Sequence, residues 1–171
     1  MADGRTTEEG SEFVMRSRTP GQTREVGDWL GRLLVRAGPA GAVVALFGPL
    51  GAGKTCFVQG LASGLGVPGG VRSPTFVLIH EHRGPVPLFH VDLYRIGPDD
   101  LDALGLEEIV DGPGVTAIEW AEHAGDVLPA EHLRVELAYG EGDGERGLRI
   151  AARGVRYAPV VEALRACASS R

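Results

Sequence analysis

Apolar residues after position 23 recur at intervals of three and four, at Val26, Trp29, Leu30, Leu33 and Leu34. This spacing gives a helix one apolar face, so we predict a helix that starts near Thr23 and ends at Gly38-Pro39. Residues 42–47 follow a different pattern, a continuous apolar run flanked by glycines. A run this short predicts a strand that is buried on both faces, as in a parallel sheet.

The other segments alternate between helix and strand in the first half of the chain and pair locally in the second half. Helices are predicted at residues 56–65, 101–110 and 159–168. Strands are predicted at residues 75–81, 86–93, 115–120, 133–138 and 147–152, the last two as a hairpin. This order predicts an α/β fold in which a largely parallel sheet is flanked by helices and carries antiparallel additions.

The N-terminal 18 residues differ from the rest of the chain. Residues 1–11 are polar and charged, which predicts a flexible tail, whereas Phe13, Val14 and Met15 predict a short edge strand within residues 12–18. Residues 19–171 form the predicted domain. A chain of 171 residues suits one compact domain, and we find neither an internal repeat nor a linker.

Charge and cysteine content narrow the possible functions. The formal net charge is −6, whereas nucleic-acid binders usually present a basic face, so tight unaided binding to DNA or RNA is not expected. Two cysteines, Cys56 and Cys167, predict a reduced, cytoplasmic protein rather than a disulfide framework. No apolar run approaches the ~20 residues of a membrane span, and the polar N-terminus shows no secretory signal.

A glycine-rich segment follows the predicted strand at residues 42–47. Residues 48–55 read G-P-L-G-A-G-K-T and match the phosphate-loop pattern G-x-x-x-x-G-K-[ST] at every fixed position. Glycines let backbone N–H groups turn toward an anion, and the start of the next helix adds its unpaired N–H groups. Lys54 would meet the β and γ phosphates, and the Thr55 hydroxyl would ligate Mg²⁺. We therefore predict a single P-loop NTPase-like domain that binds ATP or a related nucleoside triphosphate.

Two carboxylates end predicted strands and are candidates for the chemistry around Mg²⁺. Asp92 follows the run L-F-H-V, and Glu119 follows V-T-A-I. Ligands of open α/β sheets bind at the carboxyl ends of the strands. One carboxylate would hold Mg²⁺ directly or through water, and the other would orient the attacking water. An ion pair with Arg or a helix cap fits each residue equally well.

Other polar residues give weaker signals. Ser73 and Thr75 precede a predicted strand and fit either a simple turn or a switch-like segment that senses the γ phosphate. His80, His82 and His90 suggest a metal site, but no further ligand stands at a standard spacing from them. A metal site at these histidines is therefore not favoured.

Five segments together resemble the bacterial TsaE (YjeE) family of ATPases. They are L-G-A-G-K-T at residues 50–55, S-P-T-F at 73–76, H-V-D-L-Y-R at 90–95, L-G-L-E-E at 104–108 and I-E-W at 118–120. Their order and spacing fit the family across residues 19–137. The phosphate loop alone indicates only a superfamily, whereas H-x-D-L-Y-R followed by I-E-W is much more specific.

The resemblance implies a fold, an activity and partners. The family forms a single P-loop α/β domain, and its members are weak, Mg²⁺-dependent ATPases that act with the proteins TsaD and TsaB. The family serves the threonylcarbamoyladenosine modification of tRNA (N6-threonylcarbamoylation of an adenosine in ANN-decoding tRNAs). TsaD and TsaB work downstream of TsaC in this modification. ATP hydrolysis resets the TsaD–TsaB complex, and TsaE does not itself transfer the carbamoyl group. Direct contact with tRNA stays open.

The resemblance also implies roles for individual residues. Lys54, Asp92 and Glu119 are the expected catalytic residues, with Glu119 as a Mg²⁺ ligand and Asp92 needed for hydrolysis. Thr55 and both carboxylates remain candidate metal ligands, and Thr75 belongs to the switch-like segment. The expected ATP-binding residues are Thr23, Gly48, Leu50, Gly51, Ala52, Gly53, Lys54, Thr55, Cys56 and Arg146.

Two positions depart from the family pattern. Pro49 stands where family members usually have Asp, so the loop lacks that carboxylate and one backbone N–H. Cys56 stands where they usually have Thr.

Two other functions stay open from the sequence. A small-molecule kinase would need an Arg-bearing lid, and a nucleotide-dependent binding module would hydrolyse little ATP.

Overall fold

One mixed sheet organises the chain. Its strands are β1 (Glu12–Ser17), β2 (Ala42–Phe47), β3 (Ile79–His82), β4 (Leu88–Asp92), β5 (Val115–Glu119), β6 (His132–Tyr139) and β7 (Arg146–Arg153). The helices are α1 (Pro20–Ala37), α2 (Lys54–Gly64), α3 (Leu106–Val110) and α4 (Ala158–Ser169), with 3₁₀ turns η3 (Ala121–His123), η4 (Gly125–Val127) and η5 (Val155–Tyr157). The computed structural model describes residues 11–38, 41–71, 78–97, 100–101 and 104–170.

The sheet has the order β1-β7-β6-β2-β5-β4-β3, with its parallel part in the middle. β2 runs parallel to both β5 and β6, and β4 runs parallel to β5. Antiparallel ladders complete the two edges, β3 with β4 on one side and β7 with β6 and β1 on the other. The predicted α/β fold class is confirmed. Because β2, β5 and β4 are parallel, their carboxyl ends meet at one edge of the sheet.

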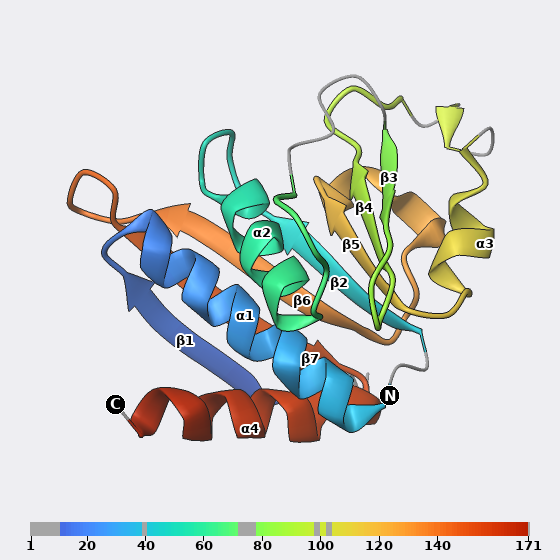
Figure 1. Ribbon diagram of the computed structural model, residues 1–171. Coiled ribbons are helices and arrows are strands. Elements are labelled where there is room, and N and C mark those ends of the chain that lie inside the picture. Colours follow the sequence, from blue (N-terminus) through green and yellow to red (C-terminus); the bar gives the residue numbers. More distant parts are fainter. Residues whose placement is uncertain (1–10, 39–40, 72–77, 98–99, 102–103, 171) are drawn as a thin grey trace, which may run out of the picture.

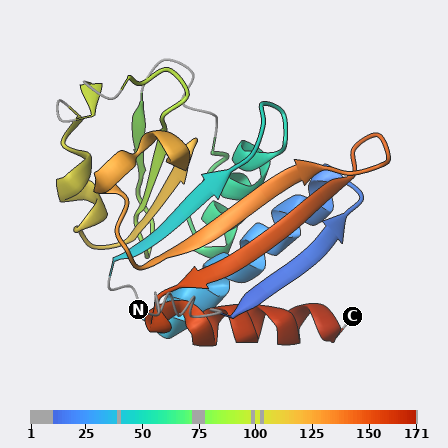
Figure 2. The same ribbon diagram turned by 180° about the vertical axis from the view of Figure 1, so that it is seen from behind.

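The two faces of the sheet are covered unequally. α1, α2 and α4 pack on one face and share a large apolar core with it (Figure 1). On the opposite face, α3, η3 and η4 pack over β2, β5 and β4 in a smaller core. Seen from behind, the outer face of β6, β7 and β1 carries no described helix (Figure 2). None of the described helices combines the length and apolar character that crossing a lipid bilayer requires.

Glycines allow α1 and α2 to approach backbone to backbone. A Cβ atom on Gly60 would lie 1.9 Å from the Arg24 carbonyl oxygen, and one on Gly27 would lie 2.3 Å from the Phe57 carbonyl oxygen. Any larger side chain would push the two helices apart. α1 therefore holds α2 at a fixed height over the sheet, and α2 begins with Lys54, the lysine of the phosphate-loop pattern.

The start of α1 corrects the prediction. The helix begins at Pro20 and not near Thr23. The Thr19 side chain caps it, because Thr19 Oγ1 accepts a hydrogen bond from the Gln22 backbone N–H at 3.2 Å. Pro20 fits the first turn, where its missing N–H leaves no bond unmade. The apolar spacing reports only the buried face, so it misses this polar first turn.

The predicted helix at residues 101–110 is shorter in the structure. Among the described residues of this segment, only Leu106–Val110 is α-helical, because Gly105 has a φ of 62°, outside the right-handed helical region. The predicted strand at residues 75–81 lies only in part within the described chain, because residues 75–77 are outside it. β3 covers Ile79–His82 instead.

Candidate nucleotide-binding site

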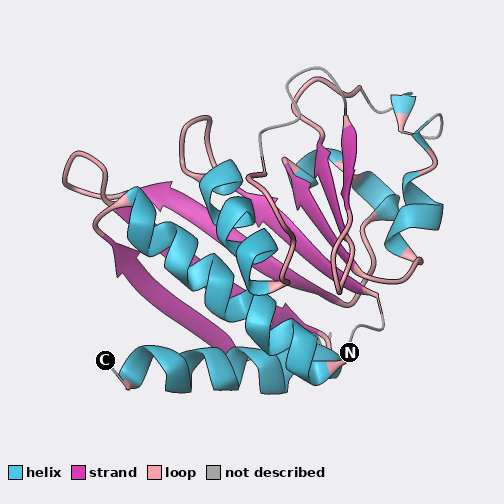
Figure 3. Cartoon of the chain, viewed as in Figure 1, coloured by secondary structure: helices cyan, strands magenta, loops and turns pink. Residues whose placement is uncertain are grey.

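The glycine-rich loop connects β2 to α2 at the carboxyl edge of the parallel strands (Figure 3). Gly48, Gly51 and Gly53 have φ values of 142°, 77° and 101°, which glycine adopts far more readily than other residues. Beside the loop lies a cavity of about 370 Å³. Its walls come from the loop and α2, from the segment before β3 and from the ends of β4 and β5, namely Leu50, Gly51, Gly53, Lys54, Thr55, Cys56, Leu78, Asp92, Tyr94, Arg95, Glu119 and Trp120.

Lys54 is turned back onto its own loop. Its Nζ donates to the carbonyl oxygens of Gly48 at 2.5 Å and Pro49 at 3.0 Å, and it lies 3.8 Å from the centre of the Trp120 ring. Burial lowers the pKa of the Lys54 ammonium, and nearby carboxylates, Glu119 first among them, offset part of that effect. An anion in the cavity would offer this buried cation a stronger partner than two neutral carbonyls do.

Glu119 is the centre of the most buried polar cluster in the site. The residue is 3% exposed, and both carboxylate oxygens accept from the Thr55 hydroxyl, at 2.8 Å and 3.0 Å. His90, which is fully buried, places its Nε2 2.7 Å from Oε1 of the same carboxylate. Three elements thus meet at one side chain: β5 supplies Glu119, α2 supplies Thr55 and β4 supplies His90.

Asp92 lies beside Glu119 because the two residues are partners in the parallel register of β4 and β5. Its Oδ1 accepts from the Tyr94 backbone N–H at 3.0 Å. Burial raises the pKa of the Asp92 carboxyl, and the negative charge of Glu119 adds to that effect. The two candidate carboxylates therefore share one wall of the cavity, opposite the loop, and Asp92 also stabilises the turn after β4.

The oxygen atoms around Glu119 fit Mg²⁺. The Thr55 hydroxyl donates its hydrogen to Glu119 and keeps oxygen lone pairs for a cation. In the described part of the chain, no group of three or more His, Cys, Asp or Glu side chains encloses a metal site. Mg²⁺ bound with a nucleotide needs no such cage, because one or two protein ligands, phosphates and water complete its shell. The donor set suits a cation that arrives with a phosphate ligand.

Comparisons with known proteins agree with one another. The family model of the threonylcarbamoyl adenosine biosynthesis protein TsaE matches residues 17–148. The chain belongs to the TsaE family. It is 39% identical to the tRNA threonylcarbamoyladenosine biosynthesis protein TsaE of Bacillus subtilis over 90% of this chain and 94% of that protein. It is 41% identical to the Treponema pallidum TsaE over 79% of this chain and 97% of that protein.

The fold agrees with a solved structure. The crystal structure of Bacillus subtilis YdiB superposes with a TM-score of 0.76, at 32% sequence identity, over 93% of this chain and 97% of that chain. Three of the five TsaE segments, at residues 50–55, 90–95 and 118–120, contribute to the walls of the cavity. In the segment at residues 104–108, Leu104 and Leu106 instead pack in the smaller core. Ser73 and Thr75 lie outside the described residues.

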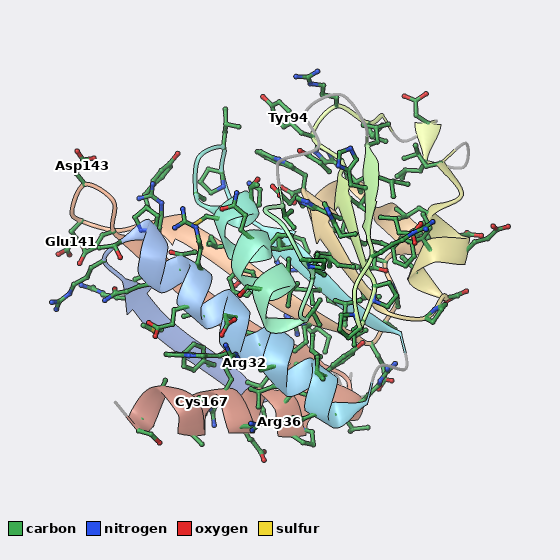
Figure 4. All side chains as sticks on the ribbon, viewed as in Figure 1. Arg32, Arg36, Tyr94, Glu141, Asp143 and Cys167 are labelled. Atoms are coloured by element: carbon green, nitrogen blue, oxygen red, sulfur yellow. The ribbon has the colours of Figure 1, made fainter. Side chains whose placement is uncertain are left out.

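Trp120 is the site residue that sequence reasoning undervalued. Its ring faces the Lys54 ammonium and lies against the Tyr94 ring at a tilt of 41°, with 4.8 Å between the ring centres. Its φ of 57° is the only positive value among the described residues other than glycine. A tryptophan held in this unfavourable backbone region indicates a functional constraint. Tyr94 is exposed at the upper side of the molecule, after β4 (Figure 4).

The hairpin of β6 and β7 holds the exposed tip of the loop from the other side. The Tyr139 hydroxyl donates to the Leu50 carbonyl, and Arg146 Nη2 donates to the Gly51 carbonyl at 3.2 Å. Tyr139 and Arg146 are register partners on adjacent strands. Arg146, an expected ATP-binding residue, thus contacts the loop backbone and does not line the cavity.

The other expected nucleotide-binding residues are placed as follows. Cys56 lines the cavity, and its thiol donates to the Pro20 carbonyl at 3.2 Å, while burial raises its pKa. Thr23 is buried behind the loop, and its hydroxyl shares a 2.8 Å hydrogen bond with Ser17. Ala52 is part of the loop and is fully buried. Of these three residues, only Cys56 faces the cavity.

Proposed function

We propose that this protein binds ATP with Mg²⁺ and hydrolyses it slowly, in support of the TsaD–TsaB complex during the threonylcarbamoyladenosine modification of tRNA. The observation that carries the proposal is the contact between Thr55 and Glu119 beside the Lys54 ammonium, on a loop that matches the phosphate-loop pattern. Membership of the TsaE family and the names of its curated relatives support the tRNA pathway.

The residues suggest how hydrolysis would proceed. The γ phosphate would draw Lys54 Nζ away from the Gly48 and Pro49 carbonyls, so the lysine exchanges neutral partners for charged ones. Thr55 and Glu119 would hold Mg²⁺, which neutralises phosphate charge when bound. Asp92, on the same wall, would orient the attacking water and accept its proton as the bond from phosphorus to the leaving ADP oxygen breaks.

Exposed apolar side chains around the cavity support a partner-dependent ATPase. Leu50 on the loop, Tyr94 after β4 and Tyr139 on β6 are all exposed, although large apolar side chains are usually buried. Leu50 and Tyr94 also line the cavity. A protein that docks over this rim would close the open side of the site and exclude water from it, and closure of this kind commonly accelerates phosphoryl transfer. The rim is thus a suitable contact for the TsaD–TsaB complex.

The test measures phosphate release from ATP by the wild-type protein and by Glu119→Ala, each alone and with purified TsaD–TsaB. We expect slow turnover by the wild type alone, faster turnover with the partners and loss of turnover in Glu119→Ala. Glu136→Ala, at a partly exposed glutamate on β6, is the matched control and should behave as wild type. Fast unstimulated turnover, or none in any mixture, would overturn the proposal. A phosphorylated small-molecule product would indicate a kinase.

A further inference from the structure

His90 is a buried polar residue to which the proposed chemistry gives no role. It is fully buried on β4, two residues before Asp92, and Asp92 is the register partner of Glu119. Residues two apart on a strand share a face, so His90 lies one step below Glu119 on the face that carries α2. Thr55 approaches the same carboxylate from α2. Glu119 is thus held between an imidazole below and a hydroxyl above.

The hydrogen bonding of His90 assigns its tautomer. Nε2 lies 2.7 Å from Glu119 Oε1, and a carboxylate only accepts hydrogen bonds when ionised. Nδ1 is buried and has no hydrogen-bond partner among the described residues. A proton on Nδ1 would leave a buried N–H unpaired and would set the Nε2 lone pair against the carboxylate. His90 therefore carries its proton on Nε2 and donates it to Glu119.

This bond fixes one oxygen of the carboxylate and so determines where the other one points. Oε1 accepts from both His90 and Thr55, whereas Oε2 accepts only from Thr55 among the described residues, at 3.0 Å. Rotation of the carboxylate about its last torsion would break the His90 bond. Oε2 is thus held beside the Thr55 hydroxyl, where a cation shared by these two oxygens would sit. Outer partners of this kind commonly orient metal ligands.

We propose that His90 is a positioning residue: its Nε2–H bond orients the Glu119 carboxylate so that Glu119 and Thr55 present their oxygens together to the divalent cation of the bound nucleotide. This inference rests on the proposed function, because it requires a cation at Thr55 and Glu119. It assigns His90 no direct contact with the nucleotide, which Lys54 and the loop backbone would bind. The loss of the bond should therefore weaken the cation and spare the nucleotide.

The test compares His90→Leu, which removes the donor, with His90→Gln, whose amide N–H reaches a position close to that of Nε2. The control is His80→Leu, because His80 faces His90 across the β3–β4 ladder, whereas His90 is the described histidine that bonds Glu119. Binding of Mn²⁺ is measured by electron paramagnetic resonance with a non-hydrolysable ATP analogue present. Affinity for the analogue is measured by calorimetry in EDTA. Thermal unfolding confirms that each variant folds.

We expect His90→Leu to weaken Mn²⁺ binding by roughly 10- to 100-fold, and His90→Gln and His80→Leu to stay within about threefold of wild type. All variants should bind the metal-free analogue within about twofold of wild type. Unchanged Mn²⁺ binding in His90→Leu, an equal loss in His90→Gln, or a parallel loss of metal-free affinity would overturn the positioning role. Absence of Mn²⁺ binding in the wild type would instead overturn the proposed function itself.

A second readout does not depend on the nucleotide. Long-range ¹H–¹⁵N NMR correlations distinguish the two neutral tautomers of a histidine. We expect His90 in the wild type to carry its proton on Nε2, and we expect the Nε2 resonance to shift in Glu119→Gln while that of His80 stays in place. A proton on Nδ1 would contradict the assigned bond and overturn the positioning role.

Discussion

The glycine-rich loop is held from two sides that differ in almost every physical respect. On the inner side, Thr55 and His90 bind the carboxylate of a single residue, Glu119, which is 3% exposed. On the outer side, Tyr139 and Arg146 bind carbonyl oxygens at the loop tip, and Leu50 and Tyr139 are 64% and 58% exposed. On the inner side the hydrogen bonds go to the oxygens of an acidic side chain, whereas on the outer side they go to backbone carbonyl oxygens alone.

The two sides of the loop differ in the role that we expect for each of them in the proposed function. Glu119 is a buried carboxylate that is hydrogen-bonded by Thr55 and His90 and has the Lys54 ammonium nearby. A buried charge is costly unless it is well paired, so the proposed cation would stabilise the inner side further. The outer bonds are exposed to water, which competes for the same carbonyls, and each contributes little to stability. If the proposed function holds, we expect the inner side to determine whether ATP is hydrolysed and the outer side only to adjust the shape of the loop.

The largest effect is expected from the loss of Lys54. Lys54→Ala removes the only lysine of the loop. A hydrogen bond between charged groups contributes about 1.5–3 kcal/mol, so ATP affinity should fall roughly 10- to 150-fold. Calorimetry with a non-hydrolysable ATP analogue measures this change. An unchanged affinity would disprove the assignment of the loop and make the comparison of its two sides irrelevant to function.

The next effect breaks the inner side alone. Thr55→Ala removes the hydroxyl that contacts Glu119, so we expect the Mg²⁺ concentration for half-maximal hydrolysis to rise roughly 10-fold or more. Affinity for metal-free ATP should change little, because Lys54 remains. Thr55→Ser keeps the hydroxyl and serves as the control. A defect in Thr55→Ser as large as that in Thr55→Ala would show that the methyl group matters and the hydroxyl does not.

A smaller effect is expected from the outer side. Tyr139→Phe removes the hydrogen bond to the Leu50 carbonyl and keeps the ring, which faces the Arg146 guanidinium at 5.0 Å. One neutral hydrogen bond contributes about 0.5–1.5 kcal/mol, and this one acts on the nucleotide only through the loop, so we expect ATP affinity to fall about threefold. Titration of the Trp120 fluorescence with ATP measures it. A loss comparable with that of Lys54→Ala would refute the distinction between the two sides.

The inner side was the more predictable of the two. The apolar run of β2, the fixed residues of the loop and the carboxylates at the ends of β4 and β5 are local features, and parallel strands bring their carboxyl ends together. Asp92 and Glu119 were therefore identified from the sequence as neighbours of the loop. The bond between His90 and Glu119 was not, because it depends on a diagonal step across the parallel register that the sequence does not specify.

The outer side was largely unpredictable. Tyr139 lies 89 residues from the carbonyl it contacts, and Arg146 lies 95 residues from its own. No spacing rule connects positions so distant, and a tyrosine at the end of a hairpin strand carries no chemical signal of its own. The left-handed backbone of Trp120 is equally hidden, because tertiary contacts impose it against the local preference of the residue. For Thr23, the family resemblance implied a contact with ATP, whereas in the structure its hydroxyl shares a hydrogen bond with Ser17.

The smallest effect concerns acid stability on the outer side. Glu136, on the same strand as Tyr139, is buried in part, which raises its pKa, but hydrogen bonds from Arg134 and Arg149 outweigh burial and hold the pKa below its ordinary value of 4.5. The unfolded chain then takes up a proton more readily than the folded one, so this stabilisation is complete above the ordinary pKa and is lost as the pH falls through the folded value. Because the side chain is 34% exposed, solvent screening limits the contribution to at most about 1 kcal/mol.

Urea unfolding at about pH 7 and at about pH 3.5 should therefore show that Glu136→Gln loses slightly less free energy of unfolding on acidification than the wild type does. ATP affinity should be the same in both proteins. A change in ATP affinity would mean that the outer side reaches the nucleotide through charge and not only through the shape of the loop.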